Sequence, residues 1–192
     1  MSNTTNIMIV GVGGQGTLLA SRILGNTAIA QGYDVKLSEV HGMSQRGGSV
    51  VTYVKYGDAV YSPIIDKGEA DIILAFELLE AKRALPYLKK GGTLIVNDQR
   101  IDPMPVIIGA AEYPETILCE LKKSVNVRSA DALTLAKEAG NPKTANVVLI
   151  GLLAASTDIP KDVWLHALKT TVPPKFLDVN LTAFEKGYNY GL

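Results

Sequence analysis

The stretch Ile7-Met-Ile-Val-Gly11-Val-Gly13-Gly14-Gln15-Gly16-Thr-Leu-Leu-Ala20 carries the strongest structural signal in this chain. A short apolar run meets glycines at G-x-G-x-x-G spacing and then passes into a helical pattern, which predicts a strand, a tight turn and a helix. Gly11 permits the turn, Gly13 lets a phosphate approach the backbone, and Gly16 lets the helix pack closely on the strand. The N–H groups and the dipole at the helix start then favour an anionic ligand.

Size and charge limit the classes of protein to consider. A chain of 192 residues is expected to form a single domain, residues 1–192, with a full hydrophobic core. Lys plus Arg and Asp plus Glu number 19 each, and no basic stripe is visible, which argues against nucleic acid as a partner. The polar start, residues 1–6, and the short apolar run, residues 147–155, predict no membrane segment and a soluble, cytoplasmic protein.

The residues that usually carry out catalysis are scarce. The lone Cys119 excludes an internal disulfide and cannot by itself ligate an iron–sulfur cluster, and its apolar neighbours predict a buried side chain. His41 and His166 are the only histidines, so no metal site is predicted, and His166 is interpreted as structural. Neither a P-loop nor a G-x-S-x-G motif is present. These observations indicate a binding subunit whose chemistry takes place elsewhere.

The second part of the glycine-motif unit departs from an ordinary dinucleotide fold. A helix over residues 17–31 and a strand over residues 33–40 follow the first strand, as expected. The chain then continues with His41-Gly-Met-Ser-Gln-Arg46-Gly47-Gly48, a loop without helical period. Two β-rich runs, residues 49–56 and 59–65, flank Gly57-Asp58 and predict a β-hairpin. A loop and a hairpin in place of a helical crossover argue against a stand-alone NAD reductase.

An alternation of strands and helices returns after the hairpin. Strands are predicted over residues 70–76, 93–97, 103–108 and 124–128, with a turn at residues 89–92, and helices over residues 77–87, 114–123, 131–139 and 142–155, followed by helices that open at Pro160 and after Pro174. This order predicts a three-layer α/β/α, Rossmann-like fold. The sheet is expected to be mainly parallel, with an inserted β-hairpin and a helical C-terminal portion.

Two motifs in this order resemble a known family. The segment Gly11 to Gly16, followed by Glu39-Val-His-Gly-Met-Ser-Gln-Arg46-Gly47-Gly48, resembles the gamma-type domain of 2-oxoacid:ferredoxin oxidoreductases. The segments Asn146-Val-Val-Leu-Ile-Gly151 and Ala183-Phe184-Glu185 are similar to that family too, so the resemblance covers essentially the whole chain. The second motif on a small free-standing chain is most similar to the branch that oxidises indolepyruvate and other aryl pyruvates.

The resemblance implies a division of labour between subunits. A larger partner subunit would bind thiamine diphosphate and [4Fe-4S] clusters, and ferredoxin would accept the electrons released when the 2-oxoacid is decarboxylated. Coenzyme A would take the acyl group, and the gamma-type domain would help to form the coenzyme A site. The chain itself carries a turn suited to phosphate, whereas the partner would supply the cofactor chemistry.

The predicted cofactor-binding residues lie in the two glycine motifs, and they are Gly11, Gly13, Gly14, Gln15, Gly16, Arg46, Gly47 and Gly48. The Arg46 guanidinium can form bidentate hydrogen bonds with a phosphate or a partner carboxylate, or it can form a structural salt bridge. Gln15 can donate to a ligand or cap a neighbouring loop. His41 is a candidate catalytic residue, with a hydrogen bond that fixes the loop as the alternative.

Two other interpretations stay open. Glu39 follows the glycines by about twenty residues, where a dinucleotide fold holds the acid that binds a ribose hydroxyl, so the chain could bind NAD or FAD. Every motif also fits a ligand-free structural subunit that only docks to its partner. Asn146 can point into the crevice beside the first loop or serve helix packing.

Overall fold

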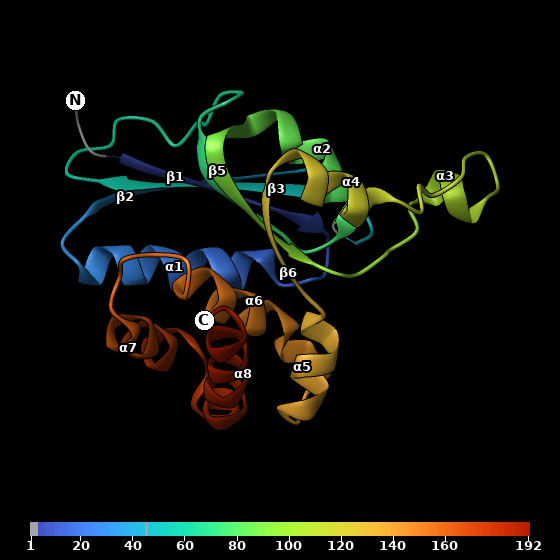
Figure 1. Ribbon diagram of the computed structural model, residues 1–192. Coiled ribbons are helices and arrows are strands. Elements are labelled where there is room, and N and C mark those ends of the chain that lie inside the picture. The colour runs from blue at the N-terminus through green and yellow to red at the C-terminus, as the bar shows by residue number, and fades with distance from the viewer. Residues whose placement is uncertain (1–3, 45) are drawn as a thin grey trace.

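A six-stranded sheet runs through the middle of the molecule in the computed structural model, which describes residues 4–44 and 46–192 (Figure 1). The strands are β1 Thr4–Val12, β2 Asp34–His41, β3 Ser49–Gly57, β4 Ala70–Ala75, β5 Leu88–Asn97 and β6 Asn126–Ala130. Their spatial order is β2-β3-β1-β4-β5-β6. Gln45 of the second glycine motif lies outside the described residues, as do residues 1–3.

The sheet is mixed rather than uniformly parallel. The neighbours β1, β4, β5 and β6 pair in parallel, whereas β3 pairs antiparallel with both β1 and β2. Since β3 is reversed relative to both neighbours, β2 runs in the same direction as β1, and only β3 opposes the common direction. The α/β architecture predicted from the sequence is confirmed.

Helices cover both faces of this sheet (Figure 1). They are α1 Thr17–Ala30, α2 Leu78–Ala84, α3 Met104–Ile107, α4 Ile117–Ser124, α5 Ala132–Glu138, α6 Ala145–Ala154, α7 Lys161–Thr171 and α8 Leu177–Tyr190, with short 3₁₀ turns at Leu85–Tyr87, Pro142–Thr144 and Pro174–Phe176. The helices α2 and α4 lie over one face, whereas α1 and α6 lie under the other. One apolar cluster therefore fills each side of the sheet, because the alternating side chains of β1, β4 and β5 point both ways.

The C-terminal helices add a further layer under α1 and α6. The helix α7 packs on α1 and α8 packs on α6, as the lower part of Figure 1 shows. Almost every residue of α6 is buried because the helix lies between the sheet and α8. Gly151 of α6 and Gly187 of α8 face the opposing backbone, and an added Cβ at Gly187 would lie 2.8 Å from the carbonyl carbon of Val148. These two glycines therefore let the helices come into backbone contact.

The β-hairpin predicted from residues 49–56 and 59–65 is wrong in its second strand. Strand β3 matches the prediction, but residues 59–65 form no strand, and β3 pairs instead with β2 through the loop of residues 42–48. Val60 and Ile65 are buried, and the Val60 N–H donates to Asp34 Oδ2 at 2.8 Å. Pro63 has no N–H to donate to a ladder, and the segment is irregular chain that buries only Val60 and Ile65.

Two further predictions in the middle of the chain need correction. Residues 103–108 were expected to form a strand but contain the short helix α3, because the Pro103 carbonyl accepts from the N–H groups of Val106 and Ile107 at 2.9 and 3.1 Å. The turn expected at residues 89–92 lies inside β5, where Gly91 has φ 82° and the register with β4 shifts. The strand was predicted at residues 103–108 because these residues are rich in β-formers. The turn was predicted at residues 89–92 because Gly91 and Gly92 are typical of turns, whereas here they belong to an irregular part of a strand.

The single cysteine is exposed, which contradicts the buried position expected for it. On α4 the residues Ile117 and Leu121, four apart, point into the core. Cys119 lies between them on the opposite side of the helix, because successive residues are about 100° apart. In the parts of the chain that the structure describes, no helix is both long enough and apolar enough to cross a bilayer.

Candidate functional site

The strands that share one direction all end at the same edge of the sheet, the carboxyl edge. The turn of residues 13–16 follows β1, the loop of residues 42–48 follows β2, and the segment of residues 98–116 follows β5. In Figure 1 this edge lies on the side from which α3 projects. Ligands of open α/β sheets bind outside this edge, so the candidate site belongs here.

The two glycine motifs are joined by backbone hydrogen bonds. The Gly13 N–H donates to the Gly48 carbonyl at 2.8 Å, and the Gly47 N–H donates to the Gly13 carbonyl at 3.2 Å. Ser49, the next residue, donates its hydroxyl to the buried Glu80 of α2 at 2.6 Å. The motifs therefore form one unit, and the Gly13 N–H is already used within the protein instead of facing a phosphate.

Gln15 fixes the first turn from inside. Its Oε1 accepts from the Val12 N–H at 2.7 Å, and its Nε2 donates to the Phe76 carbonyl at 2.9 Å. Both ends of the amide are engaged, as expected if Gln15 caps a neighbouring loop. Gly11 lies beneath this side chain, and a Cβ there would come within 2.9 Å of both Gln15 Oε1 and Phe76 Cβ.

Gly14 and Gly16 shape the start of α1. Both have positive φ, 104° and 84°, which favours glycine. A Cβ on Gly16 would lie 2.6 Å from Asn146 Nδ2, so Asn146 of α6 sits directly against the turn. The helix has no acidic residue in its first turn and no side-chain cap, so its first N–H groups and its dipole face the carboxyl edge.

Two cavities flank this turn and share Gly14 and Gly16. One of about 480 Å³ lies toward β2, and its lining comprises Gly13, Gly14, Gly16, Thr17, Leu18, Glu39, His41 and Val50. The other, of about 450 Å³, lies toward α6 and includes Gln15, Phe76, Asn97, Gln99, Lys143 and Asn146. The first cavity brings residues of both motifs together, so it is the better candidate for a ligand.

Glu39 and His41 are both placed in the first cavity. Glu39 Oε2 accepts from the Thr52 hydroxyl at 3.2 Å, and His41 Nδ1 lies 3.0 Å from the Gly42 carbonyl oxygen. In a classic dinucleotide fold the second strand is the neighbour of the first, but here β3 lies between β1 and β2. Glu39 is thus displaced from the turn by the width of one strand, about 4.8 Å.

Arg46 lies apart from the cavities. Its side chain is exposed on the loop and is absent from the described residues that line either cavity. Its carbonyl accepts from the Ser44 hydroxyl at 2.6 Å, and Gly47 has φ 76°. Arg46 is thus exposed to solvent, where an approaching ligand or a partner carboxylate can meet it.

A polar network behind the turn was missed by the sequence analysis. The Asn97 amide, which is buried, donates to the Phe76 carbonyl at 3.1 Å, and Asn97 Oδ1 accepts from the Ala132 N–H at 3.0 Å. Glu77 is also buried and lies two residues after the end of β4. The available signal was position, because Glu77 and Asn97 stand where two parallel strands end.

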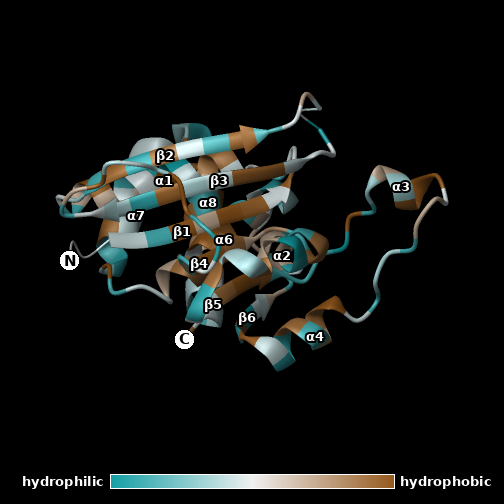
Figure 2. Ribbon diagram, turned by 90° about the horizontal axis from the view of Figure 1, so that it is seen from above, coloured by the Kyte–Doolittle hydropathy of each residue, from teal (hydrophilic) through white to brown (hydrophobic). Residues whose placement is uncertain are grey.

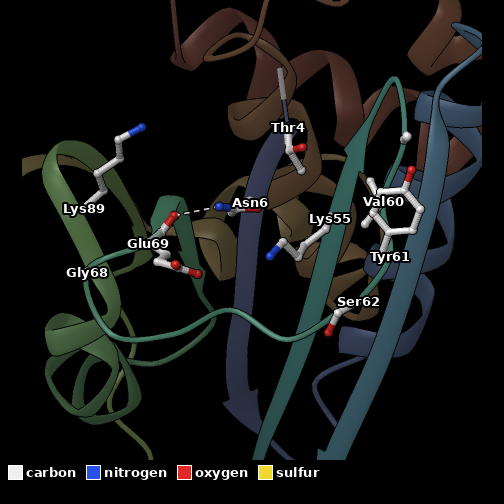
Figure 3. Close-up of a pocket in the computed structure, with 10 residues that line it drawn as sticks. Thr4, Asn6, Lys55, Val60, Tyr61, Ser62, Gly68, Glu69 and Lys89 are labelled. Atoms are coloured by element: carbon white, nitrogen blue, oxygen red, sulfur yellow. Dashed lines mark hydrogen bonds between the residues drawn. The ribbon is translucent and has the colours of Figure 1, made fainter. Parts of the chain in front are cut away.

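A further cavity of about 370 Å³ opens at the other end of the sheet (Figure 3). Lys55, Glu69 and Lys89 lie around it, and the Asn6 amide donates to the Glu69 carbonyl. The Lys55 ammonium donates to the Ile64 carbonyl at 2.8 Å, and Lys89 pairs with Asp71 at 2.9 Å. Since its cations already have protein partners and it lies far from the carboxyl edge, we do not assign the ligand site to this cavity.

Comparison with known proteins yields matches over nearly the full length. The sequence profile of the pyruvate ferredoxin/flavodoxin oxidoreductase family matches residues 6–190. The chain is 47% identical over 190 residues to indolepyruvate oxidoreductase subunit IorB of Thermococcus kodakarensis, with 95% of this chain and 93% of that relative covered.

Solved structures share the fold. A keto/oxoacid ferredoxin oxidoreductase gamma subunit from Geobacter sulfurreducens is 25% identical, with a TM-score of 0.73 and coverage of 97% and 98% of the two chains. The 2-oxoglutarate:ferredoxin oxidoreductase of Magnetococcus marinus, solved with 2-oxoglutarate, coenzyme A and succinyl-CoA, is 17% identical with a TM-score of 0.74. The match covers all of this chain but 31% of that longer one.

Proposed function

Because the chain belongs to the pyruvate ferredoxin/flavodoxin oxidoreductase family, we propose that it works as the small subunit of a 2-oxoacid:ferredoxin oxidoreductase of the indolepyruvate type. The 47% identity to an indolepyruvate oxidoreductase subunit supports the aryl pyruvate as substrate class. The larger subunit of the complex holds thiamine diphosphate and [4Fe-4S] clusters and passes electrons to ferredoxin. This chain is not catalytic alone.

One observation carries the assignment of a ligand to this subunit. The two glycine motifs are hydrogen-bonded to each other through Gly13 and through Gly47 and Gly48, directly beside the start of α1, which has no side-chain cap. A cavity of about 480 Å³ opens between them. A fixed backbone turn at a positive helix end suits a phosphate, so this cavity receives the phosphate-bearing part of coenzyme A.

The residues present fit such a ligand. Gly14 and Gly16 leave the approach to the helix start open, and Thr17 lines the same cavity. Glu39 offers carboxylate oxygens to hydroxyl or amino groups, as on a nucleoside, and Arg46, exposed on the loop outside the cavity, supplies a cation to a part of the ligand that extends beyond it. Gly13, Gly47 and Gln15 act through the backbone frame rather than by direct contact, since their polar atoms bond within the protein.

Activity of the assembled enzyme tests the proposal. We would co-express this chain with the large subunit under anaerobic conditions and measure indolepyruvate-dependent ferredoxin reduction with and without coenzyme A. Activity that needs both chains supports the subunit assignment. Reconstitution without this chain, or failure of the two chains to assemble, would contradict it.

The Arg46→Ala variant tests the ligand assignment. We expect a KM for coenzyme A raised about tenfold, as for one charge-assisted contact of roughly 1.5 kcal/mol, with the melting temperature unchanged. Arg22→Ala, an exposed arginine on α1, is the matched control and should leave this KM unchanged. An equal KM in both variants would remove Arg46 from the coenzyme A site.

Binding of NAD or FAD is the competing function, because Glu39 lines the same cavity as Gly14. Calorimetric titration of the isolated chain with coenzyme A, NAD⁺ and FAD separates the two. Binding of a dinucleotide that is lost in Glu39→Gln would favour the competing function. The displacement of β2 by one strand argues against it.

A further inference from the structure

An arm of residues 100–116 leaves the body between β5 and α4 and carries the short helix α3 (Figures 1 and 2). Three large apolar side chains near its tip are largely exposed, Met104 at 65%, Ile107 at 66% and Ile108 at 68%. Figure 2 shows the brown of apolar residues on α3, well away from the sheet. Contiguous exposed apolar side chains indicate a surface that another molecule covers.

The base of the arm is fixed by a buried carboxylate. Glu77, only 1% exposed, accepts from the Ile101 N–H at 3.2 Å and from the Tyr113 hydroxyl at 2.5 Å. Ile101 lies on the outgoing part of the arm and Tyr113 on the returning part. One carboxylate therefore clamps both ends.

A cation reinforces this clamp. Arg100 pairs with Asp102 at 2.6 Å and with Glu115 at 2.7 Å, and its guanidinium lies 4.4 Å from the centre of the Tyr113 ring. The arm is thus anchored across its base by both polar and stacking contacts.

The tip holds its own shape as well. The carbonyl of Pro105 accepts from the N–H groups of Ala110 and Ala111 at 2.8 and 3.1 Å. Val106 is partly buried against the apolar cluster on the α2 and α4 face of the sheet. An arm held in one conformation loses little entropy when it binds, which favours association. Polar contacts that hold an exposed apolar segment in one conformation are expected for a docking element.

The arm lies at the carboxyl edge, on the same side as the candidate ligand site. Leu18, Val40 and Met43 are further exposed apolar residues at that edge, beside the glycine motifs. Because β1, β2 and β5 run in the same direction, these residues and the arm flank the same face of the molecule. A partner that completes the ligand site must approach from this face.

We infer that the arm docks on the large, thiamine-bearing subunit and that its apolar tip is buried in that interface. The inference rests on the proposed function and extends it by assigning the docking element. In the Magnetococcus marinus enzyme this fold makes up 31% of one longer chain, so its neighbours there include the rest of the same polypeptide. Since this chain covers 93% of the length of the Thermococcus kodakarensis relative, the corresponding neighbour is taken to be a separate subunit.

Cys119 provides a natural reporter of docking. It is exposed and lines a cavity of about 360 Å³ together with Arg100, Tyr113 and Leu118, at the base of the arm. It is the single cysteine of the chain, so a thiol reagent modifies one position. Docking through the arm should slow alkylation of Cys119 in the complex relative to the free chain.

The test compares Ile107→Asp with Ile29→Asp in assembly with the purified large subunit. Ile29 lies on α1 and is 60% exposed, so it matches Ile107 in residue type and exposure but not in position. We expect Ile107→Asp to raise the dissociation constant at least 30-fold, as for a central interface residue, and Ile29→Asp to leave it within twofold. Both isolated variants should keep the wild-type melting temperature because the changed side chains are exposed.

The outcomes separate the two proposals. If wild type binds the large subunit and Ile107→Asp binds equally well, with Cys119 alkylated at the same rate, the docking role of the arm is wrong. If wild type does not bind the large subunit at all, the proposed function itself fails. If the free chain forms a dimer that Ile107→Asp disrupts while binding of the large subunit persists, the arm is a contact between copies of this chain, which overturns the inference.

Discussion

The close contact between α6 and α8 gives a prediction that can be worked out from the structure. Gly187 of α8 lies on the backbone of α6, where an added Cβ would overlap the Val148 carbonyl oxygen and lie 2.8 Å from its carbon. Ordinary carbon contacts are about 3.5–4.0 Å. Gly187→Ala therefore forces the two helices apart by about 1 Å, because backbone atoms cannot rotate away as a side chain does.

The expected cost combines two opposing effects. Overpacking of a close-packed interface destabilises by about 1–3 kcal/mol, and the upper end applies because the contact is with backbone on a fully buried helix. Alanine in place of glycine in a helix returns up to about 1 kcal/mol. The net loss of about 2 kcal/mol should lower the melting temperature by roughly 4–8 °C for a domain of this size.

A second helical glycine offers the matched control. Gly25 of α1 is also buried, but an added Cβ there meets only Val35 Cγ1 at 3.9 Å, an ordinary contact. Gly25→Ala should leave stability unchanged or raise it by up to about 1 kcal/mol through helix propensity alone.

Thermal unfolding followed by circular dichroism, with urea unfolding at pH 7, measures both variants. Opposite signs for Gly187→Ala and Gly25→Ala are expected. A Gly187→Ala protein as stable as Gly25→Ala would refute the claim that backbone contact holds α8 on α6.

Three further predictions concern single polar groups. Burial and the hydrogen bond to Glu77 raise the pKa of Tyr113, so the stabilising contribution of its hydroxyl is complete below about pH 10 and is lost as the pH rises above that value. In urea unfolding at pH 7, Tyr113→Phe should lower the free energy of unfolding by about 1–3 kcal/mol, and the variant should lose less stability at alkaline pH than wild type. Hydrogen bonds from Thr134 lower the pKa of Asp131, the N-cap of α5, so Asp131→Ala should lower the free energy of unfolding by about 1 kcal/mol at neutral pH. The urea unfolding curves of variant and wild type should converge as the pH falls below about 4, because protonation removes the cap in wild type too. Gln15→Ala removes the amide that joins the ends of β1 and β4, and urea unfolding should show a loss of about 1–3 kcal/mol; a loss below 0.5 kcal/mol would mean that water replaces the amide.

Much of the fold follows from local patterns. The apolar run ending at Gly11 predicted β1, and the apolar spacing after Gly16 predicted α1. Asn141-Pro142 predicted a helix over residues 142–155, where the structure has a 3₁₀ turn at Pro142–Thr144 followed by α6. Such signals are readable because side-chain period, capping and glycine conformation act within a few residues of the chain. The same locality explains the family resemblance, since both motifs are continuous segments.

The candidate site was only partly predictable. The sequence placed Gly14, Gly16 and His41 among the candidate residues, and the structure brings them to one cavity. It did not indicate that the Gly13 N–H bonds to Gly48, which requires the loop of residues 42–48 to fold back over the first turn. Glu77 was missed because its only signal is its position just after a buried strand, and the residue type alone does not show that the side chain is buried.

The sequence by itself determined most of the strands and helices, the two glycine motifs and the family. Only the tertiary structure decided that β3 enters between β1 and β2, that residues 59–65 stay irregular, and that the arm projects from the carboxyl edge. Strand pairing and burial depend on contacts between residues far apart in the chain, and a local pattern of apolar residues is compatible with several partners. Most of the secondary structure could therefore be predicted from the sequence, whereas the geometry of the site depended on which segments meet in space.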